Sequence, residues 1–295
     1  NQKGTFSDLK ITLKPAEFTF EGKPVFVEAQ LDNFDDLTYD IKAKGTLYIS
    51  KIYQVFSQKG LDIDGFVKAD LVLKGKQSDA EKGNYSKLHN KGTLELRNIL
   101  IATEYLPKKF LIKEGIFKIN QDKMSFNNFL AAYGQSDFRM NGYLQNVFNF
   151  ATTKTGVLRG SFTLNSTYIN ADEFMSETEV ATTNPATASN PETKSTSAKV
   201  ETGVIIIPSN LDLKFQANAQ KVNFNELTLK DAKGSINMYK GVLTMQNTGF
   251  NLIGCTVNMN AKYQASTPKR AQFEYDIKAS EKIFQKCLKT LIWKN

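Results

Sequence analysis

The chain has 295 residues, 41% of them apolar, which is enough for one large all-β domain or two smaller ones. Its net charge of +8 comes from 38 basic and 30 acidic residues that are mostly interleaved. Because no Arg-rich helix or aromatic RNA-binding pattern accompanies them, nucleic-acid binding is not expected, and the lysines are interpreted as solubilising exposed strands.

No stretch has the ~20 apolar residues that a membrane-spanning helix needs. The longest apolar run, at 204–208, is only as long as a strand. No signal peptide is visible at Asn1, and we expect a fragment whose targeting segment has been removed. Two cysteines without a CxxC motif, Cys255 and Cys287, predict neither a disulfide framework nor a zinc site, and whether they pair stays open.

Alternation of apolar and polar residues predicts antiparallel strands along most of the chain. The first strands carry their apolar residues at every second position between 9 and 49, with a turn at Glu21-Gly22-Lys23. The stretch GFVKADLVLKG (65–75) continues the pattern, with Lys and Asp on the face opposite its apolar residues. Such alternation is typical of strands with one buried face.

Two short helices are expected between strands. Ser50 is a suitable N-cap for a helix that Gly60 ends, and Asn170 precedes a second one with Glu173 three positions on. Phe174 and Met175 are expected to pack downward, so that these helices cover an open end of a sheet.

Four regions are predicted: a repetitive β segment with short helices (1–175), a low-complexity flexible linker or loop (176–203), a second β segment of the same sheet or lobe (204–280) and a C-terminal amphipathic helix (281–295). Residues 110–145 and 227–264 resemble each other, each ending near a Met-Asn pair (Met140-Asn141 and Met259-Asn260). This similarity indicates a repetitive architecture that lengthens by adding units, although chance similarity between two meanders is the alternative.

The sequence predicts no catalysis, no cofactor and no metal. The single histidine, His89, lies in an expected loop, and no nucleophile motif surrounds any serine. Asp62 and Asp64 resemble the start of a calcium loop, but the glycine comes too early and both residues fit the polar side of a strand.

The apolar strand faces are therefore the informative feature. The pattern alone favours an ordinary sandwich of two sheets over a sheet curled into a groove with an open apolar face.

Several stretches resemble the AsmA family, in its AsmA-like C-terminal region of the Bacteroidetes type. The stretch LDIDGFVKADLVLKGKQSDAEKGNYSKLHNKGTLELRNI (61–99) has the form Leu-Lys-Gly, a Ser-Asp loop, then Lys-Gly-Thr-Leu-Glu-Leu-Arg-Asn. GVLRGSFTLNSTYINADEFM (156–175) and the segment after the low-complexity break follow in the same order, so the resemblance covers most of 61–275.

The resemblance implies a periplasmic protein of Gram-negative bacteria, related to TamB and YhdP and anchored in the inner membrane by an N-terminal helix that this chain lacks. It implies outer-membrane biogenesis and movement of phospholipid along an apolar β-groove. The partners would be a phospholipid or another acyl-chain ligand.

We therefore expect a mainly β protein, an elongated and twisted antiparallel sheet curled into a groove or flattened barrel. Acyl chains would lie on a floor formed by Val67, Ala69, Leu71, Leu73, Leu94, Leu96, Leu211, Leu213 and Phe215. Strand parity does not say which face is concave. The alternative is a non-catalytic scaffold that assists outer-membrane protein assembly by binding an assembly partner through exposed sheet edges.

Overall fold

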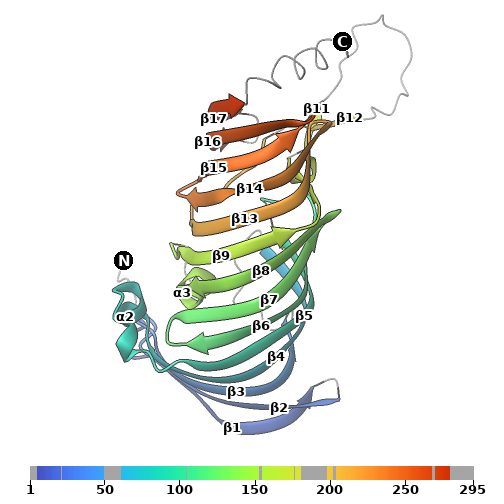
Figure 1. The fold of residues 1–295 in the computed structure, drawn as a ribbon. Coiled ribbons are helices and arrows are strands. Elements are labelled where there is room, and N and C mark those ends of the chain that lie inside the picture. The colour runs from blue at the N-terminus through green and yellow to red at the C-terminus, as the bar shows by residue number, and fades with distance from the viewer. Residues whose placement is uncertain are drawn as a thin grey trace, which may run out of the picture.

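The structure is a computed structural model that describes residues 5–20, 22–49, 61–103, 105–152, 155–175, 177–180, 198–201, 204–267 and 270–279. Within them, 15 strands form one mixed β-sheet that does not close into a barrel, and two further strands form a separate pair. The prediction of a mainly β protein built on one long curled sheet is confirmed. The sandwich favoured by the pattern alone is not formed, because the strands of the main sheet make a single layer (Figure 1).

Nine strands follow one another in chain order through the first half of the sheet, each antiparallel to the last. They are β1 (Lys10–Phe20), β2 (Lys23–Asp32), β3 (Thr38–Tyr48), β4 (Leu61–Lys76), β5 (Lys91–Thr103), β6 (Phe110–Asn120), β7 (Lys123–Tyr133), β8 (Ser136–Gln145) and β9 (Leu158–Ser166). β1 and β2 pair up to Phe20 opposite Lys23, which agrees with a turn near the expected place, although Lys23 already belongs to β2 and Glu21 lies outside the described residues.

Five strands extend the sheet beyond β9. They are β13 (Leu211–Phe224), β14 (Leu227–Tyr239), β15 (Val242–Leu252), β16 (Cys255–Thr267) and β17 (Arg270–Ala279). β13 pairs parallel to β9, so the sheet is mixed, whereas a purely antiparallel one was expected. The cause is the long connection between these strands, because a parallel pair needs a crossover from one end of the strands to the other.

That connection contains structure of its own. β10 (Ile169–Asn170) pairs parallel with β13, and β11 (Glu177–Val180) pairs with β12 (Ala198–Glu201). The last two strands lie within the region predicted as a linker, whose residues 181–197 fall outside the described part of the chain.

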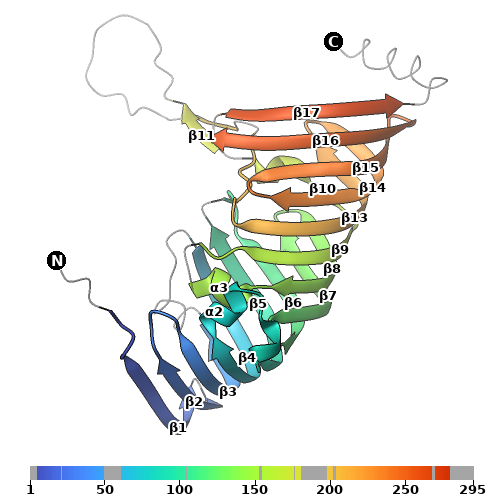
Figure 2. The same ribbon diagram turned by 90° about the vertical axis from the view of Figure 1, so that its left-hand side faces the viewer.

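The sheet is strongly curved, and short helices sit where its strands end (Figures 1 and 2). α2 (Gln77–Glu81) and η1 (Tyr85–Lys87) follow β4, whereas α3 (Val147–Thr152) follows β8. α2 and α3 nevertheless contact each other, so the sheet bends between these strands. At the opposite ends of the strands lies η2 (Ala171–Phe174), the second of the expected helices.

Of the helices predicted from the sequence, only η2 lies among the described residues. Asn170 occupies the N-cap position of η2 but makes no side-chain cap hydrogen bond. Phe174 does pack onto the sheet, with its ring stacked on that of Tyr133 at a centroid distance of 4.4 Å. The helices expected at 50–60 and 281–295 lie outside the described residues.

The two similar stretches of sequence form matching three-stranded units, β6–β8 and β14–β16. Each unit contains a β-bulge at an Asn with positive φ, Asn128 (54°) and Asn247 (50°). The backbone N–H of Asn128 donates to the side-chain oxygen of Asn141 at 2.7 Å, and that of Asn247 donates to Asn260 at 2.9 Å. The Asn of each Met-Asn pair therefore has the same role, which is to bond the bulge on the neighbouring strand.

Candidate apolar binding face

One face of the sheet, called the inner face here, carries the buried side chains. Directly opposed residues follow one another from β1 to β17 in a first apolar row that contains only apolar residues and glycine: Phe18, Val25, Gly45, Ala69, Leu94, Phe117, Phe126, Gly142, Phe162, Phe215, Ile236, Met245, Ala261 and Tyr275. Because opposed residues point to the same face, this row crosses the whole sheet without a polar side chain other than the terminal Tyr275 hydroxyl.

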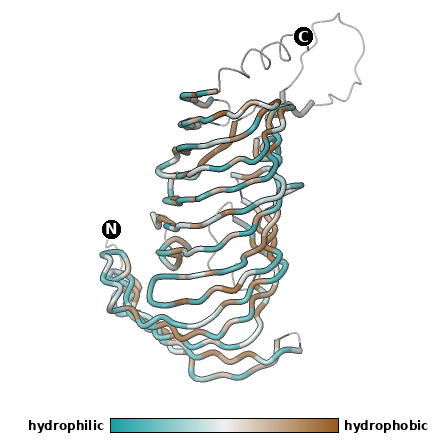
Figure 3. Tube along the Cα trace, in the orientation of Figure 1, coloured by the Kyte–Doolittle hydropathy of each residue, from teal (hydrophilic) through white to brown (hydrophobic). Residues whose placement is uncertain are grey.

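A second apolar row runs two residues along each strand from the first. It contains Ala16, Val27, Ala43, Leu71, Gly92, Ile119, Met124, Leu144, Gly160, Leu213, Met238, Leu243, Tyr263 and Phe273. Figure 3 shows the resulting alternation of hydrophobic and hydrophilic residues along the strands.

All nine residues predicted for the groove floor lie on this inner face. Ala69, Leu94 and Phe215 belong to the first row, and Leu71 and Leu213 to the second. The other four, Val67, Leu73, Leu96 and Leu211, flank the rows. Val67, Ala69 and Leu213 are buried, whereas the remaining six are partly buried.

The sequence reasoning missed the aromatic centre of the face. The rings of Phe117 and Phe126 lie 5.2 Å apart, those of Phe126 and Phe162 5.5 Å, and those of Phe162 and Phe215 5.0 Å. Phe129 joins the same cluster beside Phe117 and Phe126. These contacts connect the predicted β4–β5 floor to the predicted β13 floor, and the alternation in 116–119 and 160–164 was the signal that could have found them.

Glycines on the inner face make room for these rings. A Cβ added at Gly160 would lie 2.7 Å from the ring of Phe162, and one at Gly142 would lie 3.1 Å from it. A Cβ added at Gly115 would likewise meet the ring of Phe129. The rings therefore fill the positions that the missing side chains leave, which keeps the apolar surface continuous.

Polar groups gather at the strand ends. The Tyr133 hydroxyl donates to the carbonyl of Glu173 at 3.0 Å and accepts the N–H of Lys108 at 3.0 Å. At the other end of the strands, the Tyr39 hydroxyl accepts from the Asn90 side chain at 3.1 Å. Burial raises the pKa of both tyrosines, so the hydroxyls stay protonated near neutral pH.

Near the C-terminal strands, part of the inner face is covered by the segment 204–208. The N–H of Ile205 donates to the hydroxyl of Tyr263, a residue of the second row, at 2.7 Å. Val204 and Ile207 are buried. Over the rest of the inner face, no second sheet lies on the rows within the described ranges.

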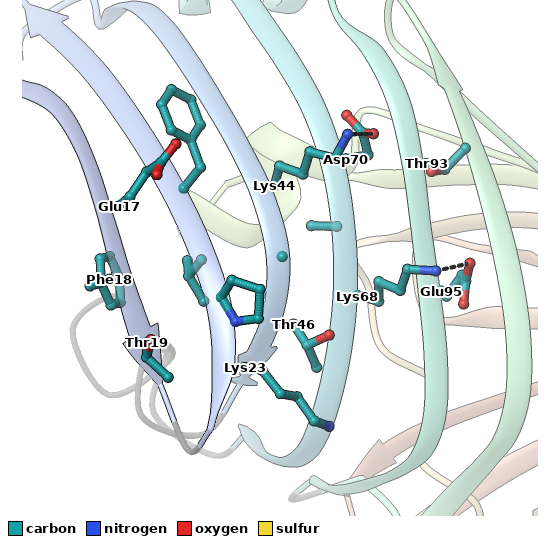
Figure 4. Close-up of a pocket in the computed structure, with 15 residues that line it drawn as sticks. Glu17, Phe18, Thr19, Lys23, Lys44, Thr46, Lys68, Asp70, Thr93 and Glu95 are labelled. Atoms are coloured by element: carbon teal, nitrogen blue, oxygen red, sulfur yellow. Dashed lines mark hydrogen bonds and ion pairs between the residues drawn. The ribbon is translucent and has the colours of Figure 1, made fainter.

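The outer face is charged and its charges are paired across strands. A hollow of about 710 Å³ lies on it over β1–β5 (Figure 4). In it, Lys44 bonds Asp70 at 3.2 Å and Lys68 bonds Glu95 at 3.1 Å. Lys23 and Glu17 line the hollow as well, so three lysines are balanced by three carboxylates and the hollow offers little net charge to an ionic ligand. Phe18, Val25, Gly45 and Ala69 of the first apolar row also contribute to its lining.

The residues weighed for other chemistry are separate from the inner face. His89 is exposed in the loop before β5, and Asp62 and Asp64 lie on the outer side of β4. In the part of the chain that the structure describes, no three His, Cys, Asp or Glu side chains are grouped as a metal site. Cys255 is buried and disulfide-bonded, and the chain's other cysteine, Cys287, lies outside the described residues.

Comparisons of the chain with families of known proteins, with curated proteins and with solved structures found no match. Among the described residues, no helix is both long enough and apolar enough to cross a membrane.

Proposed function

We propose that the inner face binds the acyl chains of lipids and that the protein binds or conducts phospholipid along it. The observation that carries this proposal is the pair of apolar rows that crosses fourteen strands in register without a second sheet over them. A hydrocarbon chain needs only apolar contact, and each buried methylene contributes about 0.8 kcal/mol.

The chemistry of the face favours a hydrocarbon over a peptide. The main-chain groups of the strands between β1 and β17 are already paired within the sheet, so they cannot bond the backbone of an extended peptide. Headgroups would remain at the strand ends, where the hydroxyls of Tyr39 and Tyr133 and the ion pair of Lys108 with Glu173 lie.

The resemblance to the AsmA family extends the proposal to the periplasm, to an inner-membrane anchor on the full-length protein and to outer-membrane biogenesis. The disulfide at Cys255 supports an oxidising compartment, because disulfides form and persist in the periplasm and are rare in the cytosol.

The test compares matched substitutions on the two faces of β4. Leu71→Asp with Leu73→Asp places charges on partly buried positions of the inner face, whereas Val72→Asp places one on the outer face between them. Each purified protein is examined by native mass spectrometry and lipid extraction, with circular dichroism as a check of the sheet.

We expect phospholipid to co-purify with the wild type and with Val72→Asp, and to be lost from the inner-face variant while its β-sheet signal persists. A wild-type protein that neither carries lipid nor takes up a fluorescent phospholipid from vesicles would refute the proposal. Loss of lipid from Val72→Asp alone would assign binding to the other face.

A non-catalytic scaffold in outer-membrane protein assembly is the second candidate. The feature that favours it is the long edge strand β17, which exposes Phe273, Tyr275 and Ile277 and has no neighbour on its far side among the described strands. A lipid-free protein that captures an outer-membrane assembly factor through this edge would support the scaffold instead.

A further inference from the structure

The two edge strands of the sheet differ in how well they are protected. β1 contains Pro15 and a bulge between Leu13 and Ala16, both of which hinder the addition of another strand. β17 has neither proline nor glycine over ten residues. Its Phe273 and Tyr275 are 51% and 64% exposed on the inner face, whereas Glu274 and Asp276 lie on the outer face, and no described strand pairs with its far side.

We propose that β17 of one copy pairs with β1 of a second copy, so that the sheets join end to end. The topology sets the geometry of this contact. β1 and β9 run in the same direction because eight antiparallel steps separate them, and β13 is parallel to β9. Four more antiparallel steps give β17 the direction of β1. A second copy with its inner face on the same side therefore presents β1 parallel to β17.

Side chains match in one register of this parallel pair. Ile11 comes to lie beside Phe273 and Leu13 beside Tyr275, all on the inner face and all more than two-fifths exposed in one copy. On the outer face Lys14 comes to lie beside Asp276, and neither side chain makes an ion pair with a described residue of its own copy. Lys10 and Lys14 flank Glu274 diagonally, but Lys10 already pairs with Asp32 and Glu274 with Lys262 in one copy, each at 3.5 Å, so the ion pair that this register adds is that of Lys14 with Asp276.

Pairing of two β17 strands is disfavoured by charge. With inner faces aligned, that pair must be antiparallel, and the register that opposes Tyr275 to itself places Glu274 against Asp276 twice. Like charges directly opposed across strands are destabilising. The copy that fits β17 is therefore one that offers its basic β1 strand.

The contact is short, because Pro15 and the bulge end it after Lys14. Five residues of each strand would pair, which favours weak association that depends on protein concentration. Since the contact joins two different surfaces of the same chain, it does not close on itself and can add further copies.

Sedimentation velocity of the purified chain over a range of concentrations tests this assembly. We expect the wild-type weight-average mass to rise with concentration and to pass that of a dimer. Glu274→Lys with Asp276→Lys, and separately Lys10→Glu with Lys14→Glu, should each weaken association about ten-fold or more. A mixture of the two variants should restore it, because each then meets a partner of opposite charge.

The matched control exchanges charges away from the edges. Lys68→Glu with Glu95→Lys reverses a cross-strand pair on the outer face of β4 and β5 and should leave association unchanged. A wild type that stays monomeric at every concentration, or edge variants that associate as the wild type does, would overturn the proposal. So would a mixture that fails to associate although both variants retain the circular dichroism spectrum of the wild type.

Discussion

Replacing Phe162 by Ala tests whether the inner face is a packed surface with the energetics of a protein core. Phe162 is buried, with 8% of its surface exposed, and its ring contacts those of Phe126 and Phe215. It also covers Gly142 and Gly160, which have no side chains to move into the space it would leave. The substitution therefore opens a cavity that neighbouring strands can fill only by shifting their backbones.

The expected loss in the free energy of unfolding is about 3–5 kcal/mol, as for buried Phe→Ala substitutions elsewhere. Phe273→Ala is the internal comparison, because Phe273 lies on the same face but is 51% exposed on the edge strand. About half of a Phe burial is lost there, or about 1 kcal/mol. Equilibrium urea denaturation followed by circular dichroism measures both. Equal losses for the two variants would show that Phe162 is not packed as the contacts indicate.

Three further predictions concern hydrogen bonds that shape the sheet. Asn141→Ala and Asn260→Ala should each lower the free energy of unfolding by about 1 kcal/mol, because each removes the acceptor for a bulge N–H, and unequal thermal shifts would argue against equivalent roles. Asp137→Ala should lower the free energy of unfolding, measured by urea denaturation, by about 1–3 kcal/mol, because the Asp137 carboxylate accepts the N–H groups of Thr167 and Tyr168. Burial alone would raise the pKa of Asp137, but these hydrogen bonds outweigh it and hold the pKa below its usual value. Burial raises the pKa of Asp122 to about 6, although the hydrogen bond from the Asn146 N–H favours the charged form and opposes this rise. The stability that protonation of Asp122 contributes is therefore fully present below about pH 4 and is lost as the pH rises through about 6. Relative to Asp122→Asn, the wild type should lose about 1 kcal/mol over that interval, after allowance for partial exposure, and parallel stability curves for the two proteins would contradict this.

The sequence predicted the parts of the fold that depend on alternation. The strands expected at 67–73 and 211–215 form as predicted. Their apolar residues, which take every second position from Val67 to Leu73 and from Leu211 to Phe215, share the inner face. The parallel pairing of β9 with β13 could not be predicted, because nothing in residues 167–210 states at which end of β9 the chain returns to the sheet. Whether the apolar face would meet a second sheet was equally undetermined, since half-buried strands of a sandwich and of a curved single layer alternate in the same way.

Strict alternation also failed inside strands, and the reason explains how the apolar rows stay continuous. In β7 the inner residues change from even to odd numbers after Phe126, and Phe129 follows the bulge at Asn128. In β5 the same change separates Leu96 from Ile99, at Asn98, which also has positive φ. A bulge adds one residue to a strand, so it reverses which positions face inward.

Each bulge is matched by a shift in the apolar sequence, as in MSFNNFLAA, where two polar residues separate Phe126 from Phe129. Without the extra residue, every side chain beyond that point would turn to the charged outer face and the rows would break. Asn suits the position because it adopts the left-handed backbone more readily than other residues with a side chain. The bulge and its bonding Asn recur in β6–β8 and β14–β16, so the repeated unit encodes the bend in the sheet together with the pattern that keeps its inner face apolar. In these two units, which supply six of the fourteen strands, the continuity of the inner face is therefore a property of the repeat, and further units of the same kind would lengthen the same apolar surface.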